Sequence, residues 1–165
     1  MSVESENNMI KEKKIYLTKE KLREYQEERH KLQKLHRHKI QKKTPVFLHS
    51  EEVSPEYLCF QEDIAFLEAR LVELENILKN VELIKAPSQK EQDKITLGAT
   101  VQVKVDGKLD EFMLVGTLEA NPLLGKISNE SPVGEALIGK KVGEIVFLSF
   151  PVKIKYEITQ IKYEF

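Results

Sequence analysis

The sequence predicts an α+β protein: an N-terminal antiparallel coiled-coil hairpin followed by a small antiparallel β-domain that carries one short helix. A strict heptad of apolar residues runs from Phe60 to Val81, which is typical of a coiled-coil seam. The charge changes sign across residues 44–55, because residues 29–43 are basic without a single acid and residues 51–82 are mainly acidic. From Ile95 the apolar residues recur at every second position, which indicates strands.

The first helix is expected to begin after Thr18, whose hydroxyl makes a favourable N-cap. Its seam is apolar near the start and becomes polar towards the break. The heptad positions are Leu22, Tyr25, Arg29, Leu32, His36 and Lys39. The two helices are therefore expected to pack only weakly against each other at the end near the break.

The second helix has a clear start signal, with Ser54 as N-cap, Pro55 at the first helical position and Glu56 in the first turn. Its seam residues alternate in steps of four and three: Phe60, Ile64, Leu67, Leu71, Leu74, Leu78 and Val81. About 25 residues per helix, at 1.5 Å per residue, give a projection of roughly 35–40 Å. Because the break is short, the helices are expected to pair antiparallel over residues 15–84, with the tip at about 44–55.

The remaining segments are expected to form a flexible N-terminus, a linker and the β-domain. Residues 1–14 are polar, and residues 85–94 combine a proline with charged side chains, as linkers do. Within residues 95–165, Asp106-Gly107 is a signal for a tight hairpin turn. The run Ser131–Gly139 begins with serine as N-cap and proline at the first helical position and ends with glycine, which predicts the short helix.

The composition limits the classes of function. The formal net charge is −1, so no overall basic field attracts nucleic acid and only local charge matters. No apolar run approaches the roughly 20 residues that a membrane span needs. The single cysteine, Cys59, excludes an intramolecular disulfide and is expected to pack near the seam. The N-terminus is polar and acidic, unlike a secretory signal, so the expected location is cytoplasmic.

The histidines do not predict a metal site. His30, His36, His38 and His49 lie in or near the hairpin. Of these, His36 and His38 are closest in sequence, but a spacing of two places them on different sides of a helix. They are interpreted as surface histidines, and no metal is expected to be held by this chain alone.

The second half carries a specific motif. Ser128–Lys140 reads SNESPVGEALIGK and is followed by GEIV at residues 143–146. Leu97–Val101 reads LGATV, and the second helix continues from Tyr57 without a gap. In these runs the chain resembles the bacterial Gre family of transcript-cleavage elongation factors, over nearly its whole length from Tyr16 onward.

The resemblance implies a partner and a mechanism. The family's C-terminal, FKBP-like domain docks on bacterial RNA polymerase, which here assigns docking to Ser131, Pro132 and Gly134. The hairpin then enters the secondary channel, where tip carboxylates help to hold a catalytic Mg²⁺ shared with the polymerase. The polymerase's own active site cleaves the backtracked RNA 3′ end. The factor is therefore expected to be a monomer without a cofactor of its own, and not an enzyme by itself.

The resemblance also implies roles at and beside the tip. Glu51 and Glu52 are the candidate carboxylates, and they are possible shared Mg²⁺ ligands. The basic residues expected to face nucleic acid are Arg37, Lys39, Lys42 and Lys43. A second interpretation of this basic run is that it forms the solvated side of the hairpin that faces the acidic helix.

The tip departs from the family pattern. The family's functional acids lie seven and four residues before the tyrosine of its tip pattern, and counting back from Tyr57 these positions are Ser50 and Val53. Glu51 and Glu52 are therefore out of register. Two hypotheses follow: a differently shaped turn presents these carboxylates to Mg²⁺, or they are solvated turn residues. In the second case the protein enters the channel as a non-catalytic regulator or inhibitor.

Overall fold

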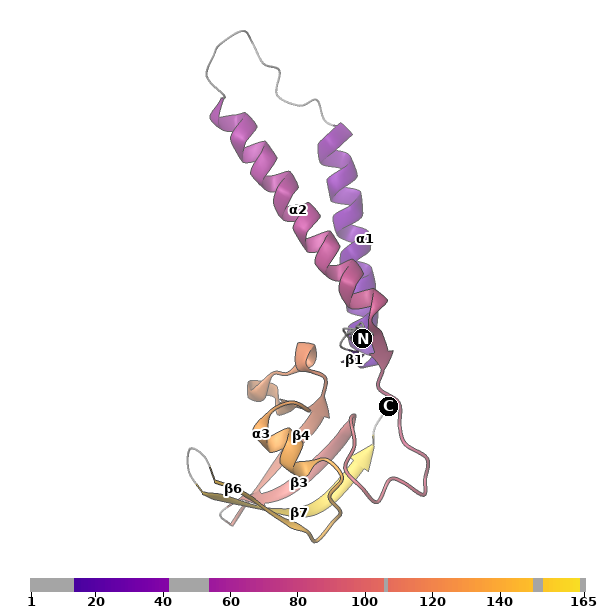
Figure 1. The fold of residues 1–165 in the computed structure, drawn as a ribbon, viewed down its shortest axis with the longest axis vertical. Coiled ribbons are helices and arrows are strands. Elements are labelled where there is room, and N and C mark those ends of the chain that lie inside the picture. Colours follow the sequence, from indigo (N-terminus) through magenta and orange to yellow (C-terminus); the bar gives the residue numbers. More distant parts are fainter. Residues whose placement is uncertain (1–13, 42–53, 106, 150–152, 164–165) are drawn as a thin grey trace, which may run out of the picture.

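The computed structural model describes residues 14–41, 54–105, 107–149 and 153–163. A long helical hairpin stands on a two-stranded base, and a separate β-domain lies beyond this base (Figure 1). The α+β fold predicted from the sequence is confirmed. Within the described ranges, no helix combines the length and the apolar character needed to cross a membrane.

The hairpin consists of α1 (Lys19–Gln41) and α2 (Pro55–Lys79). Both predicted N-caps are present. The Thr18 hydroxyl accepts a hydrogen bond from the Lys21 amide at 3.2 Å, and the Ser54 hydroxyl accepts one from the Tyr57 amide, also at 3.2 Å. These bonds satisfy amide groups that the first helical turn leaves without partners, which fixes where each helix begins.

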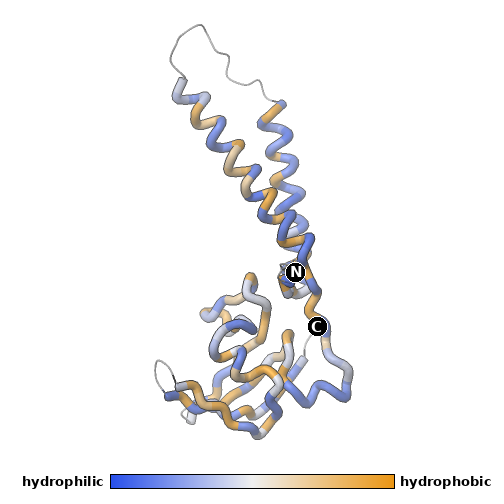
Figure 2. The backbone as a smooth tube through the Cα atoms, in the orientation of Figure 1, coloured by the Kyte–Doolittle hydropathy of each residue, from blue (hydrophilic) through white to orange (hydrophobic). Residues whose placement is uncertain are grey.

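The apolar seam is best packed near the base of the hairpin. Leu67, Leu74 and Ile77 of α2 are buried, whereas α1 has no fully buried residue. Along α1 the tube in Figure 2 is mostly hydrophilic, and the helices diverge away from the base (Figure 1). The predicted polar end of the seam therefore corresponds to a looser pair of helices.

Two details of the predicted hairpin are wrong. Val81, expected to continue the helical seam, lies instead in strand β2 (Val81–Leu83), because α2 ends at Lys79 with Asn80 as its C-cap. Cys59 is exposed and does not pack near the seam. It precedes the seam position Phe60, and successive residues of a helix point about 100° apart.

A small parallel sheet forms the base of the hairpin. Strand β1 (Ile15–Leu17) pairs with β2, with Ile15 opposite Val81 and Leu17 opposite Leu83. Leu17 is fully buried there. α1 thus begins and α2 ends at this small sheet, which was not predicted from the sequence.

The β-domain contains a five-stranded sheet in the order β5-β4-β3-β7-β6. Its strands are β3 (Ala99–Val105), β4 (Lys108–Val115), β5 (Lys126–Ser128), β6 (Ile145–Leu148) and β7 (Ile154–Tyr163). The predicted antiparallel pairing is correct for β3, β4, β6 and β7, but β5 pairs parallel to β4. The connection over residues 116–125, with short helices η1 (Thr117–Glu119) and η2 (Pro122–Leu124), returns the chain to the same end of the sheet and so permits parallel pairing.

The core of the β-domain lies between the sheet and the short helix α3 (Pro132–Leu137). Val101, Val103, Leu114 and Leu137 are fully buried. The predicted tight turn joins β3 to β4, with Val105 paired to Lys108 and Gly107 at a φ of 88°, a conformation that favours glycine. This core supports the loop that precedes α3.

Candidate functional site

Most of the predicted tip, residues 44–53, lies outside the described residues. Glu51, Glu52, Lys42 and Lys43 all fall in the segment 42–53 and stay predictions. The described residues form three candidate surfaces: the loop before α3, the sides of the hairpin and the junction between the hairpin and the β-domain.

The loop before α3 is organised by two serines. The Ser131 hydroxyl accepts a hydrogen bond from the Gly134 amide at 3.0 Å and donates one to the Ser128 carbonyl at 2.7 Å. The Ser128 hydroxyl in turn accepts a hydrogen bond from the Glu130 amide at 3.1 Å. Ser131 is therefore the N-cap of α3, as its position before Pro132 predicts. Its hydroxyl also binds the end of the preceding strand β5.

The three predicted docking residues differ in what they can do. Gly134 is buried, and a Cβ atom there would lie 2.1 Å from the Ser128 carbonyl oxygen, so only glycine fits against the loop. Ser131 is partly buried and uses its hydroxyl inside the loop. Pro132 is exposed and can contact a partner directly. Ser131 and Gly134 therefore shape the surface that Pro132 presents.

An ion pair and a hydrogen bond join side chains of the two helices of the hairpin. Lys39 of α1 pairs with Asp63 of α2, and His36 Nε2 lies 3.0 Å from a carboxylate oxygen of Glu68. All four side chains are partly exposed, so each pair contributes modestly, on the order of 0–1 kcal/mol. Lys39 thus faces the acidic helix, in agreement with the second interpretation of the basic run.

A stronger interaction joins the helices nearer the base. The Arg70 guanidinium donates to both carboxylate oxygens of Glu28, at 2.8 and 3.0 Å, and also to Glu73 at 2.8 Å. These hydrogen bonds, that to Glu28 first, raise the pKa of Arg70, because both carboxylates favour the charged guanidinium. Two parallel bonds fix direction as well as distance, so this pair sets the register of the helices.

Arg37 is the other described residue among the four basic residues expected to face nucleic acid. Its side chain is exposed, and it forms no ion pair with any residue in the described part of the chain. The role of Arg37 as a charge that faces nucleic acid stays a prediction. Lys39 thus contacts the acidic helix, whereas Arg37 is exposed to solvent.

An ion pair ties the linker to the β-domain. Lys141 Nζ lies 2.6 Å from a carboxylate oxygen of Asp93, and Lys94 bridges Lys141 in an isolated antiparallel pair. The hydrogen bond from Lys141 lowers the pKa of Asp93 below its ordinary value of 3.8. The end of the linker is thereby held against the segment that follows α3.

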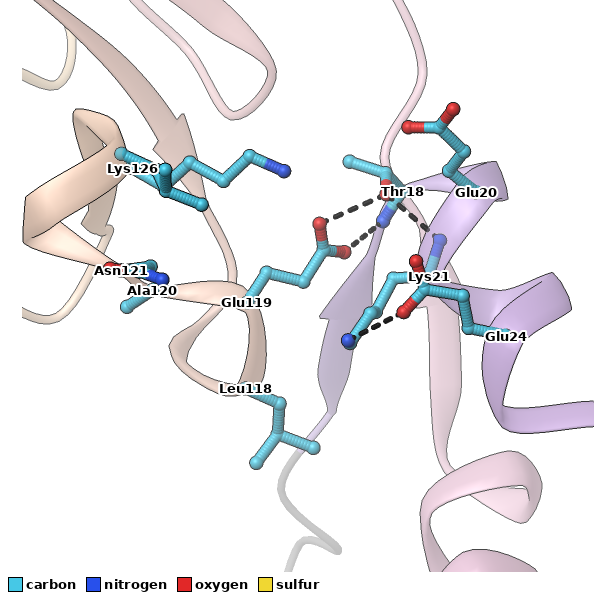
Figure 3. A pocket seen from close by; sticks show the side chains of 10 residues that line it. Thr18, Glu20, Lys21, Glu24, Leu118, Glu119, Ala120, Asn121 and Lys126 are labelled. Atoms are coloured by element: carbon cyan, nitrogen blue, oxygen red, sulfur yellow. Dashed lines mark hydrogen bonds and ion pairs between the residues drawn. The ribbon is translucent and has the colours of Figure 1, made fainter. Parts of the chain in front are cut away.

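The junction contains the buried carboxylate of Glu119, in η1. Its oxygens accept hydrogen bonds from the backbone amide of Thr18 and, at 2.9 Å, from the Thr18 hydroxyl (Figure 3). Glu119 is 7% exposed, and it is the one charged side chain that is buried within the described residues. Close to it, a Cβ atom on Gly116 would lie 1.9 Å from the carbonyl oxygen of Tyr16, so the two backbones touch there.

These junction residues were missed by reasoning from the sequence. Thr18 was recognised as an N-cap, but its partner is 101 positions away, and no local pattern marks Glu119. The described residues also contain no cluster of three or more His, Cys, Asp or Glu side chains able to hold a metal ion. The candidate Mg²⁺ ligands Glu51 and Glu52 lie outside that part of the chain.

The chain is similar in sequence to known proteins. The profile of the family described as "Transcription elongation factor, GreA/GreB, C-term" matches residues 89–163. The transcription elongation factor GreA of Clostridium acetobutylicum is 41% identical over 160 residues, which cover 93% of this chain and 100% of that protein. A second GreA, from Thermomicrobium roseum, is 44% identical over 95 residues, and this match spans only 58% of this chain and 61% of that relative.

One solved structure also aligns with this chain. GreA factor homolog 1 (Gfh1) of Thermus thermophilus aligns over 91% of this chain and 99% of that one, with 25% identity and a TM-score of 0.40. The family assignment rests on the full-length match to the Clostridium acetobutylicum protein. This chain belongs to the GreA/GreB family of transcription elongation factors.

Proposed function

We propose that this protein binds bacterial RNA polymerase, inserts its hairpin into the secondary channel and promotes cleavage of backtracked RNA by the polymerase active site. The full-length similarity to a transcription elongation factor carries this proposal. The protein acts as a cofactor of the polymerase, with no catalytic centre of its own, and works in the cytoplasm.

The shape of the molecule supports separate roles for the hairpin and the β-domain. The 25 residues of α2 extend over about 37 Å at 1.5 Å per residue. The β-domain lies at the opposite end of the hairpin from the end of α1 and the start of α2, the two helix ends that border residues 42–53 (Figure 1). A factor that docks through the loop around Pro132 can therefore place its tip far inside a narrow channel while the docking surface stays outside.

The tip would supply carboxylates. Oxygen ligands suit Mg²⁺, and carboxylates of Glu51 and Glu52 are the residues proposed to share a metal ion with the polymerase. The ion, when bound, neutralises charge on the phosphate and activates a water. Arg37, exposed on α1, attracts the RNA backbone electrostatically.

The register of the tip favours a second candidate function. Ser50 and Val53 occupy the positions where the family pattern has acids, and Glu51 and Glu52 lie between them. If the turn directs these two carboxylates away from the metal, the same docking and insertion would obstruct the channel without supporting cleavage. The protein would then act as a non-catalytic regulator or inhibitor.

Stalled, backtracked polymerase distinguishes the two functions. Addition of the protein is expected to shorten the RNA 3′ end, and the double variant Glu51→Ala/Glu52→Ala is expected to bind equally well without shortening it. No shortening by the unchanged protein, together with slower elongation or initiation, would favour the non-catalytic regulator. Failure to bind polymerase would contradict both.

Docking is tested separately at Pro132. Pro132→Glu introduces a charge on the exposed side of the loop, and a carboxylate is tolerated in a first helical turn, so the fold is expected to persist. The matched control is Leu109→Glu, which places the same charge on another exposed apolar position of the β-domain, 71% exposed. Loss of polymerase binding in Pro132→Glu alone is the expected result, and equal affinity of both variants would contradict the assigned docking surface.

A further inference from the structure

The junction between the hairpin and the β-domain contains a helix cap made from two distant parts of the chain. In a capping box, the N-cap hydroxyl bonds the N3 amide, and a Glu or Gln at N3 returns to the N-cap amide. Here Thr18 is the N-cap of α1 and N3 is Lys21, which cannot accept that bond. Glu119 of the β-domain takes the missing place and accepts from the amide of Thr18.

The same carboxylate also orients the cap hydroxyl. Thr18 Oγ1 donates to Glu119 at 2.9 Å and accepts from the Lys21 amide at 3.2 Å, so the hydroxyl proton points at the β-domain. A negative charge at the start of a long helix is further favoured by the helix dipole. Figure 3 shows the Glu119 side chain reaching from η1 to the first turn of α1.

A second contact fixes the same junction independently. Gly116 lies against the backbone of Tyr16 in β1, and any Cβ atom at this position would overlap the Tyr16 carbonyl. Beside these contacts the two halves separate around a cavity of about 310 Å³, lined by residues that include Glu24, Leu118 and Lys126. The hairpin base is thus held to the β-domain by a carboxylate bond and a backbone contact.

We propose that Glu119 is a positioning residue that completes the N-cap of α1 from the β-domain and thereby sets the direction of the hairpin relative to the docking surface. The hairpin amplifies any change at this point. Over a lever of about 37 Å, calculated at 1.5 Å per residue, a rotation of about 10° displaces the tip by about 6 Å. Cleavage requires reacting groups placed to within about 1 Å, so loosening the junction should reduce cleavage more than docking. This last consequence rests on the proposed function.

The position of the hairpin can be measured without polymerase. Cys59, the single cysteine, is exposed on α2, and Gln160→Cys adds a second exposed attachment site on β7. Spin labels at these two positions report the distance between the hairpin and the β-domain in the full-length chain. We expect one narrow distance distribution, which Glu119→Gln broadens or shifts. The two bonds from Thr18 go to different carboxylate oxygens, and glutamine replaces one of these acceptors by an NH2 group that only donates.

Control variants separate positioning from folding. Glu75→Gln removes a carboxylate from an exposed position of α2 and should leave the distribution unchanged. Thr18→Ser keeps both donor groups and should also leave it unchanged, whereas Gly116→Ala should broaden it through the other contact. Circular dichroism and amide exchange in β3 verify that each variant is folded. An unchanged distribution in folded Glu119→Gln would overturn the proposal.

The expected effect of Glu119 on RNA cleavage is tested by a separate measurement. In Glu119→Gln the cleavage rate at saturating factor is expected to fall about tenfold or more, while the concentration for half-saturation of polymerase stays the same. An altered distance with an unaltered cleavage rate would overturn the role in cleavage. If the unchanged protein neither binds polymerase nor stimulates cleavage, the proposed function fails, and the distance measurement still decides whether Glu119 sets the direction of the hairpin.

Discussion

Replacement of Gly134 by alanine is expected to disrupt the docking loop from within. In the structure, a Cβ atom at this position would lie 2.1 Å from the Ser128 carbonyl oxygen and 3.1 Å from the Ser131 hydroxyl. The nearer neighbour is backbone and cannot rotate away. The loop must therefore move off the first turn of α3, and the hydrogen bond between Ser131 and Ser128 must lengthen.

The size of the effect follows from two costs. Overpacking a well-packed site costs about 1–3 kcal/mol. Loss of an N-cap hydroxyl such as that of Ser131 costs about 0.5–2 kcal/mol. The two overlap in part because one movement causes both. The free energy of unfolding of the β-domain is expected to fall by about 2–4 kcal/mol.

Amide hydrogen exchange of the buried strand β3 measures this change in the full-length chain. Val101 and Val103 are fully buried, so their amides exchange mainly when the β-domain opens. Since 1.4 kcal/mol is a factor of ten, their exchange should accelerate by about 30- to 1,000-fold. The control is Glu135→Ala, at the next and exposed position of α3. Exchange in Gly134→Ala that matches this control would refute the reasoning.

Two further predictions concern the hairpin base and the linker. Leu74→Ala removes a fully buried side chain and should lower the free energy of unfolding by about 2–5 kcal/mol, whereas Val72→Ala, at a position 57% exposed, should change it by less than about 0.5 kcal/mol. Urea unfolding followed by circular dichroism measures both, and equal effects would contradict the described packing. The Asp93 carboxyl should titrate below pH 3.8 by NMR, because its hydrogen bond to Lys141 lowers its pKa. The stabilisation is present above the ordinary pKa and is lost as the pH falls through the lowered one. Lys141→Ala should return the midpoint towards 3.8, and an unchanged midpoint would argue against this ion pair.

Features encoded by neighbouring residues were predictable from the sequence. Ser54 with Pro55, and Ser131 with Pro132, mark helix starts because a capping side chain and a preset φ act within one turn. The turn at Gly107 was predictable for the same reason. Since each signal depends only on local geometry, it survives without knowledge of the rest of the fold.

Features that depend on distant segments were not predictable. The parallel pairing of β5 to β4 depends on the route of the connection over residues 116–125, which has no periodic pattern. The bond between Glu119 and Thr18 depends on how two halves of the chain meet. The docking motif led to Ser131, Pro132 and Gly134, but only the geometry distinguishes the exposed proline from the residues that shape its loop.

Cleavage of backtracked RNA at saturating factor tests the central claim most directly. Reactions contain equal amounts of stalled polymerase bound by the unchanged protein or by Glu51→Ala/Glu52→Ala, with occupancy of the polymerase verified in each. The account predicts rapid shortening of the RNA with the unchanged protein and loss of that stimulation in the double variant. Equal cleavage in both would contradict a role for these carboxylates, and bound but inactive unchanged protein would contradict cleavage as its function.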